Sequence, residues 1–147
     1  MSISVIRFAK EHISAAVRIE KETFSEPWSE ESLALFLREE YPSFAVCRDG
    51  ELLAYVGTSR SLDELQILTV ATAKSARRQG LGRELMKKLD EYAAENGIFS
   101  ISLEVRESNA AAISLYESCG YKKAGVRKNF YRFPTENALV MIKNSDN

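Results

Sequence analysis

Histidine, cysteine and proline are scarce in this chain, and their scarcity excludes several kinds of site. The 147 residues include one histidine, two cysteines and three prolines. A single histidine cannot supply H-E-x-x-H or any other two-histidine metal site. It could belong to a Ser-His-Asp triad, but no G-x-S-x-G motif accompanies it. His12 lies in the charged stretch AKEHIS, so we expect a surface histidine.

The two cysteines, Cys47 and Cys119, are far apart and form no C-x-x-C motif. We expect reduced thiols that pack inside a cytoplasmic protein, with a redox role as the lesser alternative. The opening residues MSISVIRFAKEH contain no long apolar run after a basic start, so we expect no signal peptide. No segment approaches the roughly 18 apolar residues that a membrane helix needs.

Charge of one sign is not in excess. Twenty Lys and Arg residues stand against 21 Asp and Glu residues, which gives a net charge of −1 and a pI near 6.0. This balance argues against a broad nucleic-acid-binding face, although a local basic patch remains compatible with it. With 45% hydrophobic and 28% charged residues, the composition predicts one soluble globular domain over residues 1–147.

The hydrophobic pattern predicts a mixed α/β domain with the element order βααβββαβαββ and one crossover unit. Asp49-Gly50 marks a hairpin between two strands within 43–60, and the apolar segment LQILTVAT predicts a central strand over 65–72. Ser29 and Ser108 are positioned to cap helices, and Gly97 is positioned to end one. The other elements are expected as strands over 2–9, 98–105, 121–133 and 137–143, and helices over 10–22, from 30, over 82–97 and over 108–120.

The stretch ARRQGLGRELM, residues 76–86, combines two glycines with arginines just before a predicted helix. The backbone amides of Gly80 and Gly82 can approach a ligand closely, and they lie where a helix start attracts an anion. This is no P-loop, and it supplies only two of the three glycines of a dinucleotide fingerprint. From the residues alone, a phosphate site and a plain basic turn fit about equally well.

The strand over 98–105 has two unlike faces. One carries Phe99, Ile101, Leu103 and Val105, and the other carries Ile98, Ser100, Ser102 and Glu104. A carboxylate at the carboxyl end of a strand in the crossover unit is well placed to act as a general base. By spacing alone, a salt bridge from Glu104 to Arg106 on the same face fits equally well.

The motif R-x-x-G-x-G, from Arg77 to Gly82, resembles the coenzyme A pyrophosphate loop of the GNAT acetyltransferases. Three further segments resemble the RimI-like branch, the ribosomal-protein alanine N-acetyltransferases: FSEPWS (24–29), LEVRESNAAAISLYESCGY (103–121) and RKNFY (127–131). The resemblance covers essentially the whole chain. It implies the GNAT fold, acetyl-CoA as co-substrate without a metal, and acetyl transfer to a protein N-terminal α-amine, such as the alanine of a small-subunit ribosomal protein.

The resemblance also implies roles for particular residues. Glu104 is the expected general base, and Tyr116 is the expected acid that protonates the leaving thiolate. A phenol of pKa near 10 is a weak donor to a thiolate near 8.5, so we expect Tyr116 to matter less than Glu104 unless its pKa is lowered. The family usually has a hydrophobic residue and a proline where Thr72 and Ala73 stand. The expected coenzyme contacts are Val70, Ala71, Thr72, Arg77, Arg78, Gln79, Gly80, Leu81, Gly82, Arg83 and Asn109.

The cost of deprotonation favours an α-amine as acceptor. At pH 7 it is roughly 1.4 kcal/mol for an α-amine of pKa about 8, but nearer 4.6 kcal/mol for a lysine of about 10.4. The acceptor, the oligomeric state and any protein partner are not identified by the sequence, and we expect no direct contact with nucleic acid or membrane. Two alternatives stay open: a GNAT enzyme that acetylates a small amine such as a polyamine or an antibiotic, and a silent acyl-CoA-binding module. The presence of both Glu104 and Tyr116 argues against silence.

Overall fold

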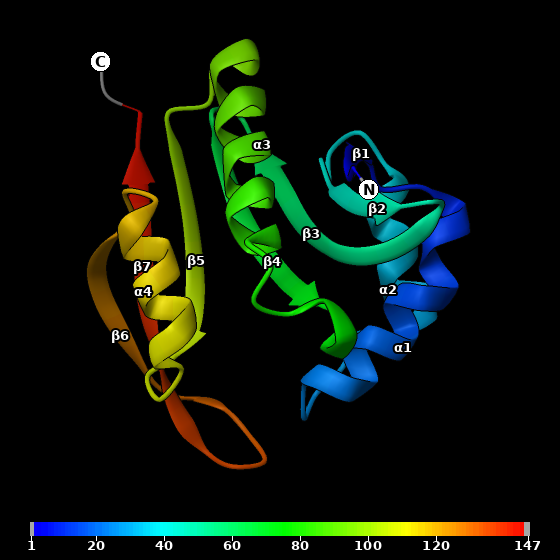
Figure 1. The fold of residues 1–147 in the computed structure, drawn as a ribbon. Helices are drawn as coiled ribbons and strands as arrows, with labels where there is room; N and C mark the ends of the chain where they lie inside the picture. Colours follow the sequence, from blue (N-terminus) through cyan, green and yellow to red (C-terminus); the bar gives the residue numbers. More distant parts are fainter. Residues whose placement is uncertain (1, 146–147) are drawn as a thin grey trace.

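The computed structural model describes residues 2–145, and its centre is a seven-stranded sheet of order β1-β2-β3-β4-β5-β7-β6 (Figure 1). Among the strands of this described range, only β4 and β5 pair in parallel. The elements follow the order βααβββαβαββ, as predicted. They are β1 (Ser4–Arg7), α1 (Ile13–Thr23), α2 (Glu30–Leu33), β2 (Phe44–Arg48), β3 (Glu51–Ser61), β4 (Glu64–Thr72), α3 (Leu81–Asn96), β5 (Ser100–Arg106), α4 (Ala110–Ser118), β6 (Lys122–Tyr131) and β7 (Glu136–Asn144), with 3-10 turns at Lys10–His12, Ala34–Leu37 and Lys74–Ala76.

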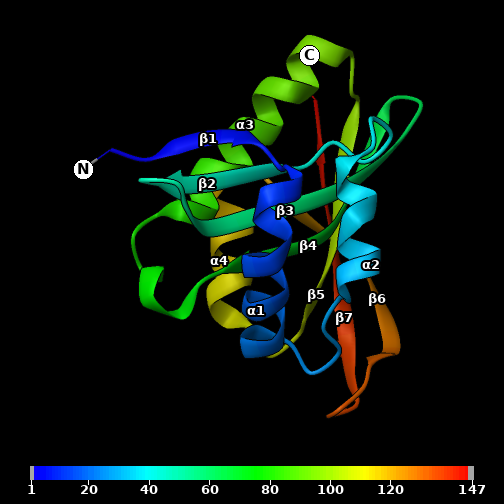
Figure 2. The same cartoon turned by 90° about the vertical axis from the view of Figure 1, so that its right-hand side faces the viewer.

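Helices cover both faces of the sheet (Figure 2). α1 and α2 lie on one face, and α3 and α4 lie on the other. The apolar stripe of α3, which includes Leu85 and Leu89 as expected, packs in the larger of two cores. The smaller core lies under α1 and α2 and includes Ile19 and Phe36. Within residues 2–145, no helix is long and apolar enough to cross a membrane.

The helix ends follow local capping chemistry. Ser29 caps α2 by accepting a hydrogen bond from the amide three residues on, and Gly97 ends α3 with a left-handed φ of 66°. Both features were predicted. The predicted Ser108 cap of α4 is wrong, because the Asn109 side chain accepts from the Ala112 amide at 3.1 Å. The Ser108 amide instead donates to Glu136 at 2.6 Å.

The prediction that His12 lies on the surface is wrong. Its side chain is buried because the 3-10 turn Lys10–His12 directs the ring inward. Nδ1 accepts from the Ala9 amide at 2.9 Å, and Nε2 lies 3.6 Å from Cys47 Sγ. Cys47 is a buried free thiol, as expected, and burial raises its pKa. Cys119 is also a free thiol, but it is only half-buried.

β4 is the central strand, as predicted, but it separates from β5 halfway along. The two strands pair only from Glu64 to Gln66 and from Ser100 to Ser102. Just beyond, Leu68 is skipped in the register with β3, where Gly57 faces Thr69 and Thr58 faces Ile67. Such a bulge bends its strand. We call the diverging segments, residues 67–72 of β4 and 103–106 of β5, the fork.

Two residues before β5 depart from the predicted faces. Ile98 is buried and Phe99 is 54% exposed, which is the reverse of what strict alternation requires. Both lie in the turn after α3, where the Phe99 amide donates to the Asp63 carbonyl at 2.6 Å. The alternation holds from Ser100 onward, so Leu103 is buried and Glu104 lies on the opposite face.

Candidate active site

Glu104 lies in the fork, two residues beyond the last β4–β5 pair. Its side chain is 14% exposed. Gln66 Nε2 donates to Glu104 Oε1 at 3.3 Å, and Arg127 Nε lies 3.6 Å from Oε2. The alternative of an Arg106 partner is wrong, because β7 brings Glu136 to 3.1 Å from that guanidinium. Glu104 therefore remains at the surface of the fork with two donors beside it.

Gln66, Arg127 and Tyr131 complete the surroundings of Glu104, and the sequence alone assigned none of them to the site. Burial, and then the nearby Glu104 charge, raise the pKa of Tyr131 to about 12. Arg127 and Tyr131 belong to the RKNFY segment. That segment was a usable signal, but the irregular register between β6 and β7 was needed to place both residues at Glu104.

Tyr116 is buried on α4, with its ring 5.9 Å from that of Tyr121 in an edge-on contact. Burial is the main cause that raises its pKa, to about 12. The condition for a stronger acid, a lowered pKa, is therefore not met. Tyr116 is also a core aromatic, and its smaller contribution than that of Glu104 stays a prediction.

The start of α3 is open to an anion. Gly80 takes the N-cap position with a left-handed φ of 76°, and no side chain caps the helix. Arg78 also has a left-handed φ, of 66°, and its exposed side chain forms no ion pair among residues 2–145. Arg77 is turned away toward Thr72 O at 3.4 Å and Thr23 Oγ1 at 3.3 Å. Unpaired amides with one free guanidinium nearby suit a phosphate group.

The side chains of Gln79 and Leu81, two further expected coenzyme contacts, are used elsewhere, which leaves their backbone groups for a ligand. Leu81 is buried in the core, and Gln79 accepts a hydrogen bond from Arg48 at 3.3 Å. A Cβ on Gly82 would lie 2.9 Å from Leu115 Cδ2. The packing of α3 against α4 therefore favours glycine at this position, because a side chain would displace Leu115.

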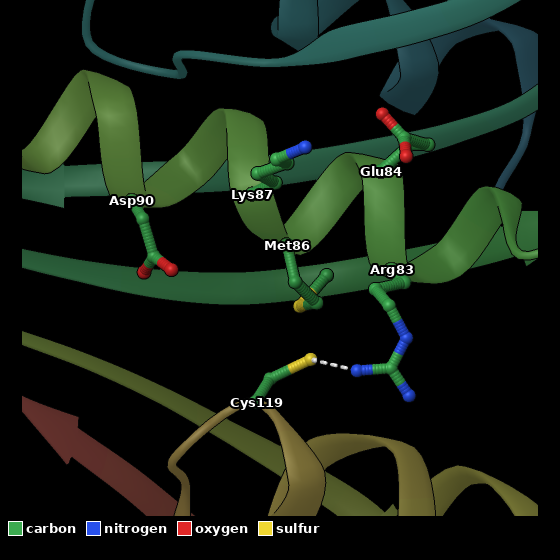
Figure 3. Close-up of a pocket in the computed structure, with 6 residues that line it drawn as sticks. All are labelled: Arg83, Glu84, Met86, Lys87, Asp90 and Cys119. Atoms are coloured by element: carbon green, nitrogen blue, oxygen red, sulfur yellow. Dashed lines mark hydrogen bonds between the residues drawn. The ribbon is translucent and has the colours of Figure 1, made fainter.

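Arg83 is tied to the end of α4, as Figure 3 shows. Its Nη2 donates to Ser118 Oγ at 2.9 Å, and its Nη1 lies 3.8 Å from Cys119 Sγ. Arg83 and Cys119 both line a pocket of about 240 Å³ beside α3. Of the three expected arginines, Arg78 is thus the one with a free side chain.

The β4 side of the fork supplies backbone groups. Val70, Ala71 and Thr72 pair with β3 on one edge, and their other edge faces the fork. Ala71 is buried, so its side chain is directed away from a ligand. Asn109 uses its side-chain oxygen as the α4 cap, which leaves its amide nitrogen to donate.

The two halves of the site lie on opposite faces of the sheet. Residues 101, 103 and 105 of β5 face α3 and α4, so Glu104 faces the side of α1, whereas the open helix start belongs to α3. The fork joins the two faces. A thioester held between the strands would meet an amine at Glu104, which is the arrangement that acyl transfer requires. No cluster of metal-binding side chains occurs in the described part of the chain.

Residues 13–121 match the acetyltransferase (GNAT) family. The [ribosomal protein bS18]-alanine N-acetyltransferase of Escherichia coli K12 is 39% identical over 133 residues, 88% of each chain. That of Haemophilus influenzae is 32% identical over 126 residues, 84% of this chain and 86% of the relative. Among solved structures, the ribosomal-protein-S18-alanine N-acetyltransferase from Escherichia coli superposes with a TM-score of 0.91 and 34% identity, covering 97% and 94% of the two chains. Arabidopsis thaliana NAA60 in complex with acetyl-CoA shares the fold at a TM-score of 0.89 and 16% identity, over 98% and 100%.

Proposed function

Because this chain belongs to the GNAT family and is an acetyl-CoA-dependent N-acetyltransferase, we propose that it acetylates the α-amine of a protein N-terminus, namely the N-terminal alanine of a small-subunit ribosomal protein. The observation that carries the proposal is Glu104, a partly exposed carboxylate in the fork of a fold that binds acetyl-CoA in a neighbour. The relatives named above act on the alanine of such a protein. The single domain would then work in the cytoplasm, where that substrate is made.

In this proposal, the start of α3 and the free edge of β4 bind acetyl-CoA. The unpaired amides at Gly80 and the free guanidinium of Arg78 suit the negative charge of a diphosphate. The β4 edge at Val70–Thr72 offers backbone groups to an amide-containing arm, and the Asn109 side-chain nitrogen offers a further donor. A free β4 amide would also stabilise the charge that develops on the thioester oxygen.

Glu104 acts on the acceptor in this scheme. It attracts the ammonium form of the amine, accepts one proton and leaves the nitrogen lone pair free to attack the thioester carbon. The C–N bond forms, the C–S bond breaks, the nitrogen releases its second proton to water, and the departing thiolate takes a proton from Tyr116 or from water. Gln66 holds one Glu104 oxygen by its amide, so the other oxygen is the one that faces Arg127 and the incoming amine.

Peptide acetylation tests the proposal. We expect a peptide with a free N-terminal alanine to be acetylated at its α-amine. The matched control is the same peptide with a blocked N-terminus and internal lysines, and a polyamine serves as the small-amine alternative. At pH 7 the pKa gap between the two amine types makes the free α-amine fraction about 200-fold larger. Mass spectrometry that places the acetyl group mainly on lysine, or kinetics in which only the polyamine reacts, would contradict the proposal.

A further inference from the structure

Arg106, the last residue of β5, holds together two segments that are far apart in sequence. Its Nη2 donates to Ser25 Oγ at 3.2 Å and to the Arg132 carbonyl at 2.9 Å. Its Nη1 donates to the Pro134 carbonyl at 3.0 Å and to Glu136 Oε1 at 3.1 Å. Ser25 follows α1, whereas the other three lie at the β6–β7 turn. Figure 2 shows the loop after α1 beside this turn.

The two segments also bind each other around Arg106. Ser25 Oγ donates to the Arg132 carbonyl at 3.1 Å, and the Arg132 amide donates to Glu26 at 3.2 Å. The Tyr131 ring lies against the Arg106 guanidinium at 4.5 Å from its centroid. We call this group, residues 25–26 and 131–136 with Arg106, the clamp.

The clamp borders the open side of the fork. Arg106 lies two residues beyond Glu104 on the same face of β5. The charges of both residues act on the pKa of Tyr131. α1 and α2 cover β2 to β4 on this face, and the loop after α1 and the β6–β7 turn border the remaining approach to Glu104 (Figure 2).

From these contacts we propose that Arg106 is a positioning residue that fixes the entrance through which the acceptor reaches Glu104. The inference rests on the proposed function. A planar guanidinium satisfies four acceptors on two segments at once, which the single ammonium group of a lysine cannot do. Without it, the two segments have to be ordered again each time a peptide binds, so peptide affinity falls while the chemistry of the bound peptide is unchanged.

The chain contains a matched control. Arg60 is also partly buried, and it donates to Leu62 O, Tyr92 Oη and Asn96, with its guanidinium 5.8 Å from the Tyr92 ring. It joins the carboxyl end of β3 to the end of α3, at the end of the strands opposite the fork. If Arg106 only stabilised the fold, Arg106→Met and Arg60→Met would change the peptide KM equally.

Steady-state kinetics with an N-terminal alanine peptide, and hydrogen exchange without any acceptor, test the proposal. In Arg106→Met we expect the peptide KM to rise roughly tenfold, as for lost hydrogen bonds to a charged group, with kcat and the acetyl-CoA KM within about twofold of wild type. The peptide KM of Arg106→Lys should lie between those of wild type and Arg106→Met, because a lysine can keep the ion pair with Glu136 but not the other three bonds. Arg60→Met should leave the peptide KM unchanged. Amides of residues 24–28 and 129–136 should exchange faster in Arg106→Met alone.

A peptide KM within twofold of wild type in Arg106→Met, or an equal rise in Arg60→Met, would overturn the proposal. So would unchanged exchange in the two segments. The exchange measurement contains no acceptor, so it tests whether Arg106 orders the two segments even if the wild-type protein acetylates a different amine. In that case the KM comparison is made with that amine. Failure of the proposed function and failure of the clamp are thus separate results.

Discussion

Replacing Glu104 by glutamine removes proton acceptance while keeping size and hydrogen-bonding reach. If Glu104 is the base, kcat at neutral pH should fall by about 10²–10⁴-fold. For an acceptor amine of pKa near 8, the free-amine fraction rises from about a tenth at pH 7 to about nine tenths at pH 9. The rate of the variant should therefore climb about tenfold over this range, and the wild type should climb less.

The contacts of Glu104 set the expected cost in stability. Its charged partner Arg127 is 3.6 Å away and 59% exposed, whereas Glu104 is 14% exposed. A pair with one solvent-exposed partner at this distance is worth about 1 kcal/mol. The Gln66 amide can still donate to the side-chain oxygen of a glutamine. For a chain of this length we expect the Tm of Glu104→Gln to stay within about 4 °C of wild type.

The assay is initial rate against pH, with thermal midpoints measured beside it. Glu107→Gln is the matched control, because Glu107 is exposed just beyond the end of β5 and lies outside the site. We expect the control to keep its turnover. A near-normal kcat of Glu104→Gln at pH 7, or an equal loss in the control, would refute the general-base assignment, and the base would have to be sought elsewhere, for example in a water held by strand-end carbonyls.

Three further results are expected. Arg78→Gln should weaken acetyl-CoA binding roughly tenfold in calorimetry, because it removes the one loop arginine with a free side chain; unchanged affinity would contradict this. Tyr116→Phe should lower kcat less than Glu104→Gln does. Since burial raises the pKa of Tyr116 to about 12, we expect its phenol to stay protonated at every pH below about 11. A loss of rate with an apparent pKa near 9 that is present in the wild type and absent in Tyr116→Phe would contradict this protonation state. Gly57→Ala should destabilise the fold by about 1–3 kcal/mol in denaturant unfolding, because its Cβ would lie 2.4 Å from the buried Phe36 ring; a wild-type midpoint would show that the ring can move.

Local sequence patterns are sufficient to predict the helices and strands and their order along the chain. The Asp49-Gly50 hairpin, the Gly97 helix end and the Ser29 cap each follow from chemistry within a few residues, and all three are confirmed. The wrong assignments required longer-range information. His12 is buried because its ring caps its own turn and meets a β2 residue, which the charged flanking sequence conceals.

In the candidate site, too, local features are predicted from the sequence and long-range contacts are not. The motif from Arg77 to Gly82 located a helix start that suits an anion, but not that the Arg77 and Arg83 side chains bond elsewhere. Glu104 was found from one strand, whereas its partners come from β4 and β6. The sequence presents Arg106 only as a neighbour of Glu104, because the loop after α1 and the β6–β7 turn meet only in three dimensions.

The extra residue in β4 explains why the site exists at this position. The segment LQILTVAT is apolar throughout, so its sequence does not show that the alternation shifts at Leu68. Without that bulge, β4 would continue to pair with β5 past Gln66, and its amides beside Glu104 would be used in the sheet. With the bulge, the two strands diverge just before Glu104, which frees backbone donors on one side and a carboxylate on the other. The fork is therefore the consequence of one added residue in a central strand, and the carboxylate, the open helix start and the clamp are arranged around it.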